Sequence, residues 1–137
     1  MSRVLAIDLG TKRTGLAVSD SLRITANPFQ TIPTKDLDLF LKNYFEKEEV
    51  GTIVVGYPKS LDGKDTQMTQ PTIRLKEKLA KAYPDKKVVL VDERFTSKMA
   101  MQSMIAMGSK KKDRMEKAGN LDKVSAAIIL RTYLDQL

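Results

Sequence analysis

Arg3-Val4-Leu5-Ala6-Ile7-Asp8 and the following Leu9-Gly10-Thr11-Lys12-Arg13-Thr14-Gly15 form the stretch of sequence that decides the fold. The first part is apolar and rich in branched side chains, which predicts a buried strand that ends at Asp8. Two glycines then flank a polar run, a composition typical of a turn. Residues 16–19 and 23–32 continue as a second and a third strand with short connections, so we expect an antiparallel meander.

The rest of the chain alternates between helical and strand patterns. The predicted elements are a helix over residues 37–45, a strand over 50–55, a helix over 67–83 with Pro71 in its first turn, a strand over 87–91, a short helix over 97–107, a basic loop over 109–119 and a last helix from Leu121. This order predicts one α/β domain over residues 1–137, a mixed five-stranded sheet with helices on both faces. Strands one, four and five should run parallel, so their C-terminal ends share one edge.

Composition limits the chemistry that this chain can perform. It has no Cys and no His, which excludes the usual zinc sites, Cys nucleophiles and Ser/His/Asp triads. Acid–base work must therefore fall to carboxylates, Lys, Tyr or metal-bound water, and oxygen ligands favour Mg²⁺ or Mn²⁺. The lack of Cys and of a signal-peptide pattern fits a cytoplasmic protein, and no apolar run is long enough to span a membrane.

The net charge of +7 is concentrated in one segment. The segment from Arg94 to Lys123 contains eight basic residues and three acidic ones. Such a segment raises the local affinity for polyphosphate partners, although a solvated basic surface would have the same composition.

Carboxylates end the strands that should meet at one edge of the sheet. Asp8 ends the first strand, Asp92 and Glu93 follow the fifth, and Asp122 shares a helical stripe with apolar residues that should face the sheet. Gathered acids repel one another unless cations lie between them, so the pattern predicts divalent metal and hydrolysis of phosphodiester bonds. Spacing alone leaves the choice between Asp92 and Glu93 open, and each acid also suits a turn or a helix cap. Asp20, at the far end of the second strand, should be structural.

Four motifs resemble the YqgF/RuvX family, whose fold is RNase H-like. They are Asp8-Leu9-Gly10-Thr11-Lys12-Arg13 with Gly15, Ser19 and Asp20; Val55-Gly56-Tyr57-Pro58 with Asp62-Gly63; Asp92-Glu93-Arg94-Phe95-Thr96-Ser97; and Asp122-Lys123 with the helix that follows. The resemblance implies that Asp8, Glu93 and Asp122 are the catalytic, metal-binding acids. It implies a nuclease, with processing of the 5′ end of pre-16S rRNA as the preferred role and Holliday junction resolution as the alternative.

Phosphate contacts are expected from the first turn and from basic residues near the edge. The candidates are Gly10, Thr11, Lys12, Arg13, Lys59, Lys64, Arg94, Lys110, Lys111 and Lys112. With aromatic residues at only 6%, the site loops show no platform for stacking bases. Two other functions remain open, a phosphotransferase that uses the same Asp-Leu-Gly-Thr opening and a non-catalytic nucleic-acid-binding module. The sequence does not choose between RNA and junction DNA or give the oligomeric state.

Overall fold

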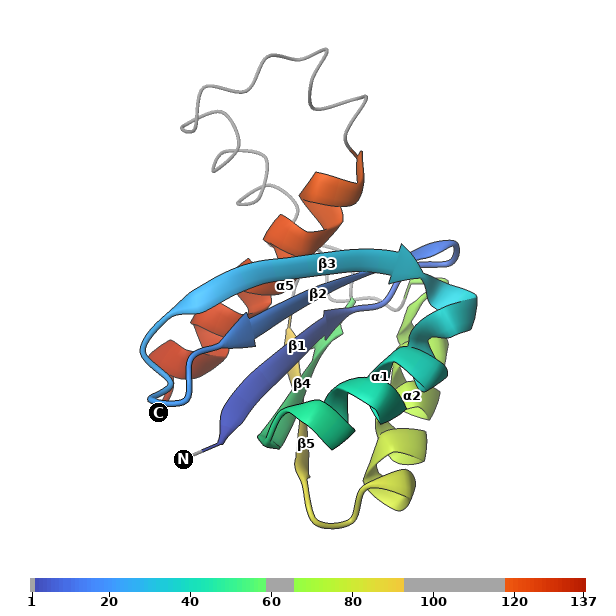
Figure 1. Cartoon of the computed structure of the whole chain (residues 1–137). Helices are drawn as coiled ribbons and strands as arrows, with labels where there is room; N and C mark the ends of the chain where they lie inside the picture. Colours follow the sequence, from blue (N-terminus) through green and yellow to red (C-terminus); the bar gives the residue numbers. More distant parts are fainter. Residues whose placement is uncertain (1, 59–65, 93–117) are drawn as a thin grey trace, which may run out of the picture.

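The structure, a computed structural model, describes residues 2–58, 66–92 and 118–137, with side chains for all of these except 118–122. Five strands form one sheet in the order β3-β2-β1-β4-β5 (Figure 1). The strands are β1 (Arg3–Asp8), β2 (Arg13–Ser19), β3 (Ala26–Pro33), β4 (Val50–Tyr57) and β5 (Lys87–Asp92). The described helices are α1 (Leu37–Lys47), α2 (Thr69–Ala82) and α5 (Ala118–Asp135), and a 3-10 turn, η1 (Thr34–Asp36), precedes α1.

Strand direction confirms the predicted mixed sheet. β1 pairs antiparallel with β2, which pairs antiparallel with β3, whereas β4 runs parallel to both β1 and β5. The C-terminal ends of β1, β4 and β5 therefore lie at the same edge. We call this edge the carboxyl edge; it is where α/β sheets usually carry their sites.

Two apolar layers hold the helices against opposite faces of the sheet. Leu5, Ile7 and their neighbours face α1 and α2 in one cluster, whereas Val4 and Ala6 face α5 in the other. This is the alternation that an extended chain imposes, and the continuous apolar sequence of β1 reflects burial on both faces. Within the described residues, no helix combines the length and apolar character needed to cross a bilayer.

Several boundaries differ from the sequence prediction. β3 begins at Ala26 rather than Arg23, because Asp20 Oδ1 accepts the backbone N–H groups of Ile24 and Thr25 at 2.8 and 2.9 Å and extends the turn. Arg23 lies in that turn with a φ of 59°. α5 begins at Ala118, ahead of the predicted start. The predicted helix over 97–107 and most of the predicted basic loop over 109–119 lie outside the described residues.

Asp20 is structural, as predicted, and its role in the β2–β3 turn makes stability depend on pH. The backbone N–H of Thr25 leads the hydrogen bonds that lower the pKa of Asp20 below its ordinary value of 3.8. A lowered pKa in the folded state means that the stabilisation is present above about pH 4 and is lost as the pH falls through the folded-state value. We expect Asp20→Asn to lower the melting temperature at pH 7, and this loss to shrink as the pH falls through the folded-state pKa of Asp20. Thermal unfolding at a series of pH values checks it, and a loss that does not change with pH would contradict it.

Candidate functional site

Asp8 is an acid at the carboxyl edge. It is the last residue of β1, it is half-buried, and its alternation with Val4 and Ala6 places it on the face that α5 covers. Across the sheet it lies opposite Gly15 of β2. The four buried residues that precede it in β1 fix this position, so Asp8 is held by the central strand of the sheet.

Glycines flank Asp8 on both neighbouring strands. Gly15 is its partner on β2, and the pairing of Ile7 with Val55 brings the next residue of β4, Gly56, alongside Asp8. Neither glycine carries a side chain, so no side chain of a neighbouring strand stands directly beside the carboxylate on the α5 side. A half-buried carboxylate is an oxygen ligand of the kind that divalent Mg²⁺ takes in proteins.

Asp92 lies on the opposite face of the sheet from Asp8. It pairs with Tyr57, is exposed, and alternates with Leu90, which packs on the α1 and α2 side. β4 separates β5 from β1, so the two strand ends are about 10 Å apart at a strand spacing of about 4.8 Å. Asp92 and Asp8 therefore do not converge on one metal from the same face. Glu93, the family-implied choice, lies outside the described residues.

Asp122 belongs to α5, but its side chain is outside the described set. The predicted stripe of this helix does face the sheet, since Ala126, Ile129 and Tyr133 are 0%, 1% and 7% exposed. Residue 122 stands one turn before Ala126 on that stripe. The helix face expected to deliver the carboxylate is thus the buried face.

The β1–β2 turn is fixed by a residue that sequence reasoning missed. Thr34 Oγ1 donates to Gly10 O at 2.7 Å, its backbone N–H donates to Lys12 O at 3.0 Å, and its hydroxyl lies 2.9 Å from Thr14 Oγ1. A Cβ on Gly10 would overlap the carbonyl oxygen of Arg13, so the turn is tight enough to require glycine there. Thr34 gave no sequence signal beyond its place directly after the third strand.

A second threonine holds the end of β4 against α2. Thr69 Oγ1 donates to Pro58 O at 2.7 Å and accepts the backbone N–H of Thr66 at 2.8 Å. Thr11 Oγ1 in turn donates to Met68 Sδ at 3.5 Å. These contacts join the β1–β2 turn to the segment after β4, so two loops of the carboxyl edge are positioned together.

The predicted phosphate contacts divide into two groups. Thr11, Lys12 and Arg13 are exposed on the β1–β2 turn, and Gly10 is partly exposed beside them. The structure therefore brings these four together near Asp8. The remaining candidates, Lys59, Lys64, Arg94, Lys110, Lys111 and Lys112, lie outside the described residues.

Known proteins resemble this chain over nearly its full length. Residues 2–136 match the RuvX family, described as Holliday junction resolvase. A protein of Phocaeicola vulgatus named "Putative pre-16S rRNA nuclease" is 48% identical over 98% of this chain and 96% of its own length. A protein of Flavobacterium johnsoniae with the same name is 46% identical over 98% of this chain and 96% of its own length.

A solved structure has the same fold at low sequence identity. The chain aligns with T. thermophilus RuvC in complex with Holliday junction substrate at a TM-score of 0.57 and 14% identity, over 99% of this chain and 96% of that one. At this identity the likeness shows the fold alone, and it confirms the predicted RNase H-like architecture.

Proposed function

We propose that this chain, which belongs to the RuvX family, is a metal-dependent endonuclease that hydrolyses phosphodiester bonds of nucleic acid. The observation that carries the proposal is the placement of Asp8. A half-buried carboxylate stands at the carboxyl edge between two glycines, on the face covered by α5. Relatives named "Putative pre-16S rRNA nuclease" align with 98% of the chain, so the similarity is not confined to one segment.

The proposed catalytic acids are Asp8, Glu93 and Asp122. Asp8 is on the face that α5 covers, and α5 contacts that face through Ala126 and Ile129. Position 122 comes one helical turn before Ala126. Asp92 is on the other face, so it does not share the face of Asp8. This position counts against Asp92 as a partner of Asp8 and supports the choice of Glu93 that the family resemblance implies.

These three acids would hold Mg²⁺ or Mn²⁺, the cations that oxygen ligands favour. When bound, the metal supplies an activated water and stabilises charge on the leaving oxygen. The chain itself positions the substrate: main-chain N–H groups around Gly10 approach a phosphate, and Lys12 and Arg13 pair with the flanking phosphates. The hydrogen bonds of Thr34 to Gly10 O and Lys12 O hold the backbone of this turn in place beside Asp8.

The proposed substrate is structured RNA, with the 5′ end of pre-16S rRNA favoured because the similar relatives carry that name. Such a role fits a cytoplasmic protein. Holliday junction DNA is the second candidate, and the description of the matching family favours it. Symmetric cutting of a junction would need two active sites and hence a dimer.

A substrate panel with purified protein tests the proposal. Precursor 16S rRNA fragments, unstructured single-stranded RNA and four-way DNA junctions are incubated with Mg²⁺, with Mn²⁺ and with excess chelator. We expect cleavage near the mature 5′ end of the rRNA fragment, none with chelator, and slower cutting of the junction. Junction cutting that exceeds RNA cutting would replace the RNA role with the resolvase role. Binding without cleavage under every condition would instead support the non-catalytic module.

A further inference from the structure

The aromatic residues, sparse in the sequence, gather at one place in the fold. Five of the eight form a continuous set of ring contacts, and all five are partly exposed: Phe29, Phe40, Tyr44, Phe45 and Tyr83. Phe40 and Tyr44 are nearly parallel, with centroids 6.0 Å apart and an interplanar angle of 9°. The set lies on the α1 side of the sheet, away from the face of Asp8.

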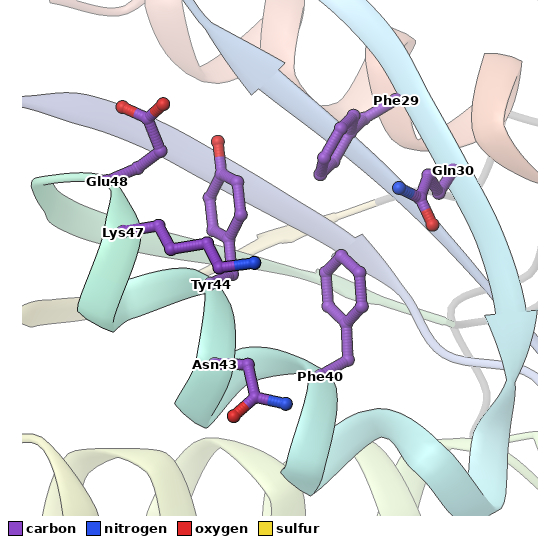
Figure 2. Close-up of a pocket in the computed structure, with 7 residues that line it drawn as sticks. All are labelled: Phe29, Gln30, Phe40, Asn43, Tyr44, Lys47 and Glu48. Atoms are coloured by element: carbon purple, nitrogen blue, oxygen red, sulfur yellow. The ribbon is translucent and has the colours of Figure 1, made fainter.

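A cavity of about 420 Å³ opens between α1 and the edge strand β3, against these rings. Figure 2 shows Phe40 and Tyr44 rising from α1 toward Phe29 on β3, with the Lys47 side chain running past Tyr44. Gln30 of β3 and Asn43 of α1 also line the cavity. The wall therefore combines flat π-surfaces with neutral groups that both donate and accept hydrogen bonds.

The lining of the cavity carries one basic and one acidic side chain, Lys47 and Glu48. Glu48 pairs with Arg3 Nε at 3.4 Å, and Asp38, in the first turn of α1, pairs with Lys78. Lys47 has no carboxylate partner among the ion pairs of the described residues. A ligand with a planar, hydrogen-bonding group could lie against the aromatic rings and the amide side chains. A phosphate attached to that group could pair with the ammonium of Lys47.

We propose that this cavity binds an unpaired nucleotide of the substrate strand, at a subsite outside the cleavage site. The base stacks on Tyr44 and Phe40, the amides of Gln30 and Asn43 contact its edge, and Lys47 pairs with its phosphate. This inference rests on the proposed function, since it assigns the substrate a single-stranded region. Duplexes keep their bases stacked inside and cannot fill the cavity.

Basic residues lie between the cavity and the carboxyl edge. α1 begins directly after η1, and the hydrogen bond from Thr34 N to Lys12 O brings Lys35 next to Lys12 and Arg13 on the β1–β2 turn. Lys35, Lys12 and Arg13 are all exposed. A strand held at the cavity can therefore pass along the end of β3 and over this turn to reach the other face.

A single tryptophan at the cavity tests the proposal, because the natural chain contains none. In Tyr44→Trp/Asp8→Asn, a 12-nucleotide single-stranded RNA should quench the fluorescence saturably, and the matched duplex should not. Adding Lys47→Glu should raise the RNA concentration at half-maximal quenching about tenfold. Phe40→Leu should raise this concentration more than Phe40→Tyr, which keeps an aromatic ring. In the cleaving enzyme, Lys47→Glu should raise KM and leave kcat unchanged. Aromatic NMR signals of Tyr44 in Asp8→Asn provide the same readout if the tryptophan variant does not fold.

Three results would overturn the inference. The first is an unchanged tryptophan fluorescence although anisotropy shows that the same RNA binds. The second is equal quenching by the duplex. The third is a fluorescence that depends on protein concentration without RNA, which would indicate a second copy of the chain as the occupant. The proposed function fails separately, when Asp8→Asn retains full cleavage; quenching would then still stand.

Discussion

Asp8→Asn abolishes Mg²⁺- or Mn²⁺-dependent cleavage while nucleic-acid affinity stays within about threefold, because phosphate contacts made elsewhere supply most of the binding. The amide keeps the size of the carboxylate but removes the negative charge that holds a cation. Loss of a residue that merely supports a metal ligand typically costs about 10–100-fold, so a direct ligand should cost at least about 10²-fold. Single-turnover cleavage and filter binding, measured on the same preparation, separate the two effects.

The adjacent acids of β5 offer a matched control for this prediction. Glu93→Gln should reduce cleavage as severely as Asp8→Asn, whereas Asp92→Asn should retain most of it, because Asp92 lies on the opposite face of the sheet. Both variants remove one negative charge at nearly the same place along the chain. Equal losses would show that total charge at the edge matters rather than metal coordination. Undiminished cleavage by Asp8→Asn, with contaminating nuclease excluded, would end the nuclease assignment.

Gly10→Ala destabilises the protein by about 1–3 kcal/mol, the usual cost of forcing extra atoms into a closely packed region. The new Cβ would overlap the backbone carbonyl of Arg13, which cannot rotate away. The turn must open, and the hydrogen bond from Thr34 Oγ1 to Gly10 O at 2.7 Å would be distorted. Since a misplacement of about 1 Å near the chemistry can cost about 10²-fold, we expect cleavage to fall by about tenfold or more. Chemical denaturation and kcat/KM measure the two effects.

Gly51→Ala is the control for Gly10→Ala. A Cβ there would meet the side chains of Ser2 and Arg23 rather than backbone. Side chains can change rotamer, and Ser2 lies at the N-terminus, away from the carboxyl edge. Gly51→Ala should therefore cost less stability and leave kcat/KM unchanged. If the two variants behaved alike, the tight β1–β2 turn would not be the cause of the loss at Gly10.

The family and the fold could be predicted from sequence because their signals are local. Continuous apolar runs predicted β1, β4 and β5, and the comparisons confirmed the resemblance of the motifs to the RuvX family. The prediction of where β3 begins was wrong because Asp20 binds backbone four and five residues ahead, which no composition rule signals. That residues 1–137 form one domain stays a prediction, as do the three catalytic acids.

Spacing along the chain could not assign the roles of neighbouring acids or find the residues that position the site. Asp92 and Glu93 are equivalent in sequence, and only the packing of Leu90 and Val91 on opposite faces shows that Asp92 lies away from the face of Asp8. Thr34 lies 24 residues from Gly10, to which it donates a hydrogen bond. The sequence pattern also suggested no stacking platform. In the fold, however, the ring centroids of Phe29 in β3 and Tyr44 in α1 lie 5.3 Å apart.

The sequence by itself therefore determined the elements, their order and the strand that ends at Asp8, since each depends on a run of adjacent residues. Tertiary structure alone decided that Asp92 lies on the face opposite Asp8, how the β1–β2 turn is fixed and where the aromatic residues meet. The physical reason is that face and proximity follow from strand pairing and packing between segments far apart in the chain. For Asp8, the sequence supplied the carboxylate, and the pairing of β1 with β2 and β4 put a glycine on each side of it.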